Sequence, residues 1–145
     1  MSYLLDTCII SKLRKIKSDS DELLQSWILS HAEKDYFISA LTIGEIQFGI
    51  SKLNSKESKK KMVLEDWLLG DLISRFKDRI LPLDVHTTSI WGSIRGKAHH
   101  KGMTLSVIDA LIAATAIQYN LILVTENIKD FLHAGVHLIN PCQRL

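Results

Sequence analysis

The first ten residues, MSYLLDTCII (1–10), place a single acid between two apolar runs. The first run, residues 3–5, is short and apolar, as in a buried strand. The second run, after Thr7, has the spacing of a helix. Asp6 therefore lies where a strand is expected to give way to a helix. An aspartate at that position either caps the helix or is one of several carboxylates that bind a metal ion.

Short apolar runs recur along the chain and alternate with longer segments of helical spacing. The predicted strands cover residues 3–5, 36–40, 80–83, 121–125 and 136–139, and the predicted helices cover residues 7–16, 21–33, 42–53, 57–77, 87–100 and 106–119. Such alternation is typical of βαβ units, so we expect an α/β fold with a mainly parallel sheet and helices on both faces. No linker or internal repeat is evident, and residues 1–145 are predicted to form one domain.

The composition is that of a soluble globular chain, with 46% hydrophobic and 23% charged residues. No apolar run approaches the roughly 20 residues of a membrane span, and the first residues lack a secretory signal pattern, so we expect a cytoplasmic protein. Cys8 and Cys142 stand far apart without C-x-x-C spacing, which argues against a disulfide framework or a cysteine zinc site. The six histidines do not have the spacing of a metal site either.

Two features of the surface have alternative interpretations. Basic residues gather at 12–17, 56–61 and 95–102, although the net charge is only +2. These clusters either follow a phosphate backbone or are solvated helix faces, and the second interpretation is favoured for residues 56–61. The stretch KMVLEDWLLGDLISRF (61–76) is apolar around more of its circumference than one core-facing stripe requires. It is either a helix buried on two sides or a surface for a partner or a second copy.

Polar residues occupy equivalent places after three of the predicted strands or at the start of a helix. Asp6 follows the first strand, Glu45 lies just beyond the second, Asp109 begins the helix before the fourth strand, and Asn127 follows that strand. In a parallel α/β sheet, the ends of the strands and the beginnings of the following helices share one edge. Three acids from distant parts of the chain are therefore expected to converge there.

Helix capping is the alternative explanation for each acid taken alone. Thr42-x-x-Glu45 and Ser106-x-x-Asp109 both match the capping-box pattern, and Asp6 suits an N-cap. Asp109, however, is embedded in the almost wholly apolar stretch VIDALIAATAI (107–117). A buried charge needs a partner, and a divalent cation shared by several carboxylates would provide one. Oxygen-only ligands favour Mg²⁺ or Mn²⁺, which suits the hydrolysis of a phosphodiester by an activated water.

Four stretches, LLDTCIIS (4–11), SALTIGEIQFGI (39–50), VIDALIAATA (107–116) and LILVTENIKDF (121–131), resemble the ordered motifs of PIN-domain ribonucleases. The resemblance is to the VapC-type and FitB-like toxins of bacterial toxin–antitoxin pairs in particular. It covers nearly the whole chain, including the closing VHLINP (136–141). It implies an α/β/α sandwich with a five-stranded parallel sheet, a Mg²⁺- or Mn²⁺-dependent ribonuclease, and a homodimer. It also implies a cognate antitoxin, through which operator DNA is bound indirectly.

The resemblance assigns roles to individual residues. Asp6, Glu45 and Asp109 are the implied metal-binding acids, and Asn127 stands where many relatives place a fourth acid. Thr7 and Thr125 lie beside these positions, and Asp130 either supplies a carboxylate or caps a helix. The basic residues that we expect to contact RNA phosphates, chosen from their clustering, are Arg14, Lys15, Arg95, Lys97 and Lys101.

Three positions depart from the pattern of the family. Cys8 replaces a frequent asparagine, which predicts the loss of one polar contact to the acids. Glu126 replaces a frequent arginine and is predicted to make the mouth of the site less attractive to RNA. Asn127 in place of an acid favours one tightly held metal ion over two. The leading hypothesis is accordingly a metal-dependent endoribonuclease toxin, and the alternative is a catalytically weak PIN fold that binds RNA or protein.

Overall fold

The computed structural model describes residues 1–15 and 21–144. Its strands are β1 (Tyr3–Leu5), β2 (Tyr36–Ser39), β3 (Ile80–Leu81), β4 (Ile122–Val124) and β5 (Leu138–Ile139). The α-helices are α1 (Thr7–Arg14), α2 (Glu22–Leu29), α3 (Ala40–Ser51), α4 (Ser58–Asp66), α5 (Ile73–Arg75), α6 (Val85–His100), α7 (Val107–Gln118) and α8 (Ile128–Phe131). A π-helix, η4 (Trp67–Leu72), joins α4 to α5, and short 3₁₀ turns lie at η2 (Glu33–Asp35), η3 (Ser55–Glu57) and η5 (Lys77–Arg79).

The strands form one five-stranded sheet in the order β3-β2-β1-β4-β5, and all of its pairs are parallel. The central strand β1 aligns Tyr3 with Tyr36 of β2 on one side and with Ile122 of β4 on the other. The chain therefore winds outward from β1 in two directions, and the crevice at that switch point is where ligands of such sheets bind. This arrangement confirms the predicted α/β fold with a five-stranded parallel sheet.

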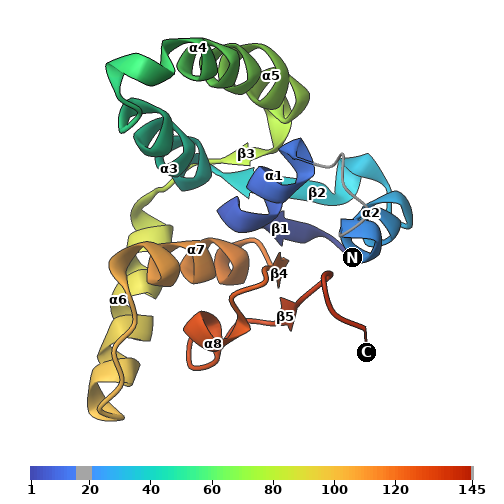
Figure 1. The fold of residues 1–145 in the computed structure, drawn as a ribbon. Helices are drawn as coiled ribbons and strands as arrows, with labels where there is room; N and C mark the ends of the chain where they lie inside the picture. Colours follow the sequence, from blue (N-terminus) through green and yellow to red (C-terminus); the bar gives the residue numbers. More distant parts are fainter. Residues whose placement is uncertain (16–20, 145) are drawn as a thin grey trace.

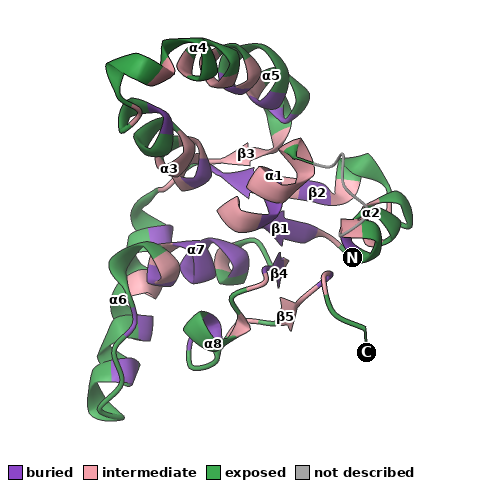
Figure 2. Cartoon of the chain, viewed as in Figure 1, coloured by how far each residue is buried: buried purple, intermediate pink, exposed green. Residues whose placement is uncertain are grey.

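Helices cover both faces of the sheet, and the alternation of side chains along β1 divides the core between them (Figure 1). Leu4 points into a cluster with Ile112 and Ala113 of α7. Tyr3 and Leu5 point the other way, into a cluster with residues of α1, α2 and the η4 segment. Strands β1, β2 and β4 form the buried centre of the molecule with α7, whereas the edge strands β3 and β5 are half-buried and α4 and α6 expose much of their surfaces (Figure 2). The predicted α/β/α layering is thus confirmed.

Several predicted boundaries were wrong by a few residues. Helix α3 begins at Ala40 rather than at residue 42, because Ser39 ends β2 and its hydroxyl accepts the N–H of Leu41. Helix α6 begins at Val85 because Asp84 caps it. Residue 16, the predicted end of the first helix, lies outside the described residues. The predicted helix over 57–77 is instead three helical pieces, since its backbone widens into the π-helix at Trp67.

The segment 61–76 is buried on one side only. Leu68, Leu72 and Phe76 follow one another at intervals of four and pack into the core. Met62 and Leu69 each keep 64% of their surface exposed. This contradicts burial on two sides and favours the alternative of a surface for a partner. In the described part of the chain, no helix is long and apolar enough to cross a membrane.

Candidate active site

Asp6 is held at the carboxyl end of the central strand by contacts to both of its carboxylate oxygens. Its backbone N–H continues the sheet by donating to the Val124 carbonyl at 3.0 Å. Oδ1 accepts the Thr7 N–H at 2.8 Å, which makes Asp6 the N-cap of α1. Oδ2 accepts the hydroxyl of Thr125 at 2.8 Å. Asp6 is 7% exposed, so capping and a role at the site coexist in one buried side chain.

Glu45 reaches the same place from α3. The Thr7 hydroxyl donates to Glu45 Oε1 at 2.7 Å, and the same hydroxyl lies 3.1 Å from that of Thr42. Glu45 lies in the second turn of α3, whose N-cap is Ser39, so the predicted capping box with Thr42 was wrong. Thr42 is fully buried and joins the site through Thr7. Sequence reasoning missed this role, although a buried hydroxyl three residues before an acid was the signal for it.

Thr125 connects Asp6 to the turn after β4. Its hydroxyl donates to Asp6 Oδ2 and accepts the Asn127 N–H at 3.0 Å. Asn127 is exposed and lies at the N-cap position of α8, and its side chain makes no capping hydrogen bond. The structure therefore brings the backbone of Asn127 to the site.

Cys8 stands where relatives often have asparagine, and it was predicted to lack a polar contact to the acids, yet its thiol contacts Asp6. Its thiol lies 3.7 Å from Asp6 Oδ2 and 3.6 Å from the Thr125 hydroxyl. Burial, followed by the nearby Asp6 charge, raises the pKa of the thiol. The thiol is therefore protonated at neutral pH and can donate weakly to the carboxylate. The predicted loss of a polar contact at this position was wrong, since a weaker contact is present.

Asp109 adds a third carboxylate from the first turn of α7. Its N–H donates to the hydroxyl of Ser106 at 3.1 Å, so Ser106 caps α7 and the carboxylate of Asp109 does not. Burial raises the pKa of Asp109, and the charges of Asp130 and Asp6 raise it further. Asp130 lies within α8 rather than at its cap, so its predicted capping role was wrong.

The three carboxylates carry like charges and repel one another, and no cation of the described residues pairs with them. Burial raises the pKa of Glu45, the Thr7 hydrogen bond opposes that shift, and the charges of Asp6 and Asp109 add to it. Among the ion pairs of the described residues, none involves these three acids. Asp6 is buried and Glu45 and Asp109 are half-buried, and carboxylates in such surroundings without a counter-charge are costly in free energy.

The donor set suits a hard divalent cation, although the metal site is not preformed. Across residues 1–15 and 21–144, no three His, Cys, Asp or Glu side chains stand in a ready-made metal-binding group. The three acids nevertheless offer only oxygen atoms, and their mutual repulsion is what a bound cation would relieve. Mg²⁺ and Mn²⁺ prefer such oxygen ligands and keep several of their waters. The residues present therefore fit the expected cation.

Glu126 points toward a lysine rather than standing free at the mouth of the site. Its carboxylate lies 2.8 Å from Lys12 Nζ, and Lys12 also approaches Asp21 at 3.7 Å. These three residues line a cavity of about 250 Å³ together with Cys142. The charge of Glu126 is thus compensated within the protein, which weakens the predicted repulsion of RNA at this position.

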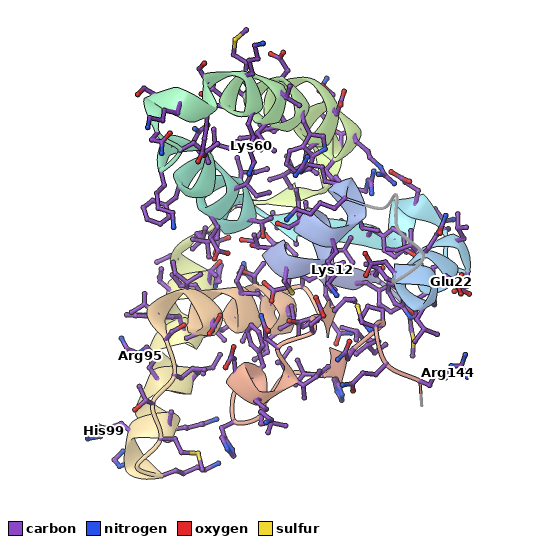
Figure 3. The ribbon with its side chains drawn as sticks, in the orientation of Figure 1. Lys12, Glu22, Lys60, Arg95, His99 and Arg144 are labelled. Atoms are coloured by element: carbon purple, nitrogen blue, oxygen red, sulfur yellow. The ribbon has the colours of Figure 1, made fainter. Side chains whose placement is uncertain are left out.

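The basic residues predicted to contact phosphate lie in two separate places. Arg95 lies over the ring of Trp91 at 5.5 Å, on α6 with Lys97, and Lys101 caps the end of that helix. Arg95 and His99 follow α6, on the part of the molecule away from the α4 arm that carries Lys60 (Figure 3). Lys15 is exposed at the end of α1. None of the five predicted residues forms an ion pair with the acids in the described part of the chain.

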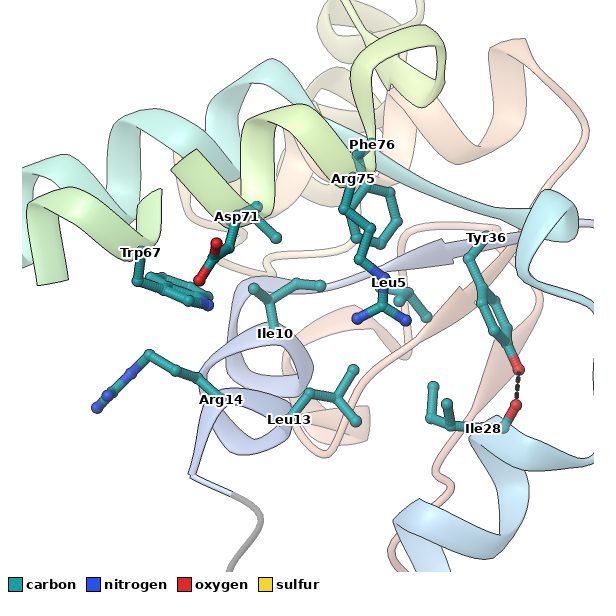
Figure 4. A pocket seen from close by; sticks show the side chains of 11 residues that line it. Leu5, Ile10, Leu13, Arg14, Ile28, Tyr36, Trp67, Asp71, Arg75 and Phe76 are labelled. Carbon is teal, nitrogen blue, oxygen red and sulfur yellow. Dashed lines mark hydrogen bonds between the residues drawn. The ribbon is translucent and has the colours of Figure 1, made fainter. Parts of the chain in front are cut away.

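Arg14 faces a different cavity, of about 100 Å³, between α1, α2 and the η4–α5 segment (Figure 4). Its guanidinium lies 5.8 Å from the centre of the Trp67 ring. At the other end of the cavity, the Tyr36 hydroxyl donates to the Ile28 carbonyl at 2.7 Å. The three site acids do not line this cavity.

The geometry of the sheet and its acids agrees with a known family. Residues 3–136 match the model of the PIN domain. The chain belongs to the PIN-domain family. Two relatives of this PIN domain are Toxin FitB of Neisseria gonorrhoeae, 34% identical over 95% of this chain and 96% of that protein, and VapC ribonuclease Y4jK of Sinorhizobium fredii. The second is 28% identical over 94% of this chain and 95% of its own length.

Solved structures extend the similarity to the whole fold. The structure of FitAB bound to an IR36 DNA fragment matches with a TM-score of 0.87 and 31% identity, over 99% of this PIN domain and 97% of that chain. The resemblance in four short motifs is therefore confirmed as membership of the family.

Proposed function

We propose that this PIN domain is a metal-dependent endoribonuclease and the toxin of a toxin–antitoxin pair, acting as one domain over residues 1–145 in the cytoplasm. The observation that supports the proposal is that the charges of Asp6 and Asp109 both act on Glu45, while none of the three acids forms an ion pair within the described residues. Membership of a family with relatives named as a toxin and as a ribonuclease supports it.

Asp6, Glu45 and Asp109 would hold the Mg²⁺ or Mn²⁺ ion. When bound, the cation polarises the phosphodiester and makes a water more acidic, so that it can attack phosphorus. The protein contributes fixed orientation. Thr125 and the N–H of Thr7 each bond one oxygen of Asp6, and the Thr7 hydroxyl holds one oxygen of Glu45. These bonds restrict the rotamers of Asp6 and Glu45, so that their remaining carboxylate lone pairs would be available to a cation.

Two further residues have supporting roles in this proposal. The backbone N–H of Asn127 bonds Thr125, which in turn bonds Asp6, and we assign the exposed amide of Asn127 to orienting a water or a phosphate oxygen. The charge of Asp130 raises the pKa of Asp109, and we assign Asp130 the role of an outer carboxylate. With an amide at position 127, the site has three acids of its own, which favours one cation over two.

Cleavage of a transfer RNA pool tests the proposal. Purified protein is assayed with Mg²⁺, with Mn²⁺ and with a chelator, beside an Asp109→Asn variant prepared in the same way. We expect metal-dependent cleavage that the variant lacks while it keeps the circular dichroism of the wild type. Equal cleavage by both proteins would reveal a contaminant. No cleavage by either would favour the alternative function, a PIN fold that binds RNA or protein.

We further infer that the protein is a homodimer that an antitoxin inhibits, with operator DNA reached only through the antitoxin. The exposed apolar side chains of Phe48, Met62, Val63 and Leu69 support an assembly, since solvated surfaces seldom gather so many. Light scattering of the purified chain tests the dimer, and co-expression with the product of a neighbouring short reading frame tests the antitoxin. A monomer at micromolar concentration would contradict the first inference.

A further inference from the structure

A groove of about 550 Å³ lies between the C-terminal half of α6, α7 and the residues that follow α8. We call it the α6–α8 groove. Its floor is apolar and includes Ile94, Ile117 and Leu132, and its polar side chains are Lys97, Lys101 and His133. The site acids do not line it, so it is separate from the candidate active site.

The charge of the α6–α8 groove has one sign. Lys97 lies in the last turn of α6, Lys101 caps the end of this helix four residues later, and both side chains line the groove. His133 comes from the opposite wall. No aspartate or glutamate is among the described residues that line the groove, and within the described chain neither lysine forms an ion pair. The groove is thus prepared for an anion.

Positive charge also covers another face of α6. Residues 85–108 contain no acid, and Arg95, His99 and His100 are exposed on this helix. Arg95 and His99 line a separate pocket, so they lie on a different face of α6 from Lys97 and Lys101. The favourable interaction of cations with the C-terminal end of the helix dipole does not account for His133 or for the apolar floor. Two lysines beside an apolar floor, with no acid among the described residues that line the groove, suit a polymer with regular phosphates and flat bases better than an isolated acidic side chain.

We propose that the α6–α8 groove binds the phosphate backbone of the RNA substrate, at a place distinct from the carboxylates. The inference rests on the proposed function, because it names a second contact for the same substrate. Lys97 and Lys101 pair with phosphates, and the apolar floor takes the face of a base or a ribose. Such a contact raises affinity for RNA that is long enough to reach both places.

Binding to the inactive Asp109→Asn protein tests the proposal without relying on cleavage. The dissociation constant for a transfer RNA pool is measured by fluorescence anisotropy at several salt concentrations. The test variant carries Lys97→Gln and Lys101→Gln, which keep long side chains, and the control carries Lys59→Gln and Lys60→Gln on the exposed face of α4. We expect the groove variant to lose about tenfold in affinity and its log–log salt slope to fall by about 1 to 2, with no change in the control.

Three outcomes would overturn the proposal. Equal loss in both double variants would mean that only the net charge matters. Unchanged binding and an unchanged salt slope in the groove variant would remove the groove from the RNA path. Unchanged RNA binding combined with weaker capture of a co-expressed antitoxin would assign the groove to a protein segment. If the wild type fails to cleave RNA but the binding result holds, the proposed function fails and the groove remains an RNA site.

Discussion

Strand β2 is flanked by two glutamates that the fold treats in opposite ways. Glu33, before the strand, accepts hydrogen bonds from Arg75 and Arg79, and the bond from Arg75 lowers its pKa. Glu45, beyond the strand, accepts a threonine hydroxyl and forms no ion pair within residues 1–15 and 21–144, and burial raises its pKa. The two residues are chemically identical, so the difference lies entirely in what the surrounding chain brings to each end of the sheet.

The comparison separates an acid that serves the fold from one that serves the site. At the amino edge, the protein supplies its own guanidinium groups, and the carboxylate is satisfied within the chain. At the carboxyl edge, the charges of Asp6 and Asp109 act on Glu45, and no ion pair of the described residues compensates these three acids. Unpaired charges lower the stability of the fold, and such a loss of stability is common at sites that bind a ligand.

The largest expected effect is on catalysis. Glu45→Gln keeps the size of the side chain and removes one charge, and we expect RNA cleavage to fall by at least about 100-fold, the scale on which electrostatic groups in active sites act. Glu33→Gln is the matched control and should cleave at the wild-type rate. Initial rates with saturating Mg²⁺ measure both. Similar cleavage rates for the two variants would contradict the assignment of Glu45, and not Glu33, to the active site.

Metal ions should stabilise the protein through the same edge. A cation that binds only the folded state adds about 2.7 kcal/mol at 100 times its dissociation constant, so thermal unfolding should shift upward with added Mn²⁺. Asp109→Asn should lose most of that shift and should unfold at a higher temperature than the metal-free wild type, because repulsion is relieved. Glu33→Gln should keep the full shift. A shift of equal size in Asp109→Asn would place the ion elsewhere.

Sequence patterns predicted the layers because strands and helices depend on short-range signals, while the shared metal-binding role of the acids stays a prediction. Strand β1 runs directly into Asp6, and the apolar surroundings of Asp109 set it apart from an ordinary cap. The π-helix at Trp67 was missed because its residues carry a normal helical pattern. The role of Thr42 was missed because it depends on Thr7, which is 35 residues away in the sequence.

Ion pairs between residues far apart in the sequence could not be predicted from local sequence patterns. Glu126 follows a predicted strand and has no lysine or arginine close to it in the sequence except Lys129, yet the fold brings Lys12 to within 2.8 Å of it. Arg79 likewise reaches Glu33 across 46 residues. Which acids are paired and which are not is therefore decided by the tertiary fold, and that distinction is what sets the two ends of β2 apart.

A smaller effect is expected at the paired edge, on stability alone. Arg79 is mostly buried and donates to the backbone carbonyls of Glu33, Tyr36 and Arg75, each at 2.7 Å. Arg79→Ala leaves these carbonyls without the donor, and we expect a loss of about 2 kcal/mol in the free energy of unfolding by urea. The folded fraction should still cleave RNA at the wild-type rate. Loss of cleavage in fully folded protein would tie this edge to the site.

The smallest effect is the pH dependence of Glu33. Its pKa is lower in the folded state than in the unfolded state, so the ion pair adds stability above the unfolded pKa, and this stability is lost as the pH falls through the folded pKa. Because the pair is half-exposed, the contribution at neutral pH is about 0.5 kcal/mol. The difference in unfolding free energy between the wild type and Glu33→Gln should therefore shrink toward zero on acidification to below pH ~4. A difference that stays constant with pH would mean that Glu33 acts through its shape and hydrogen bonds, and that its charge does not distinguish it from Glu45.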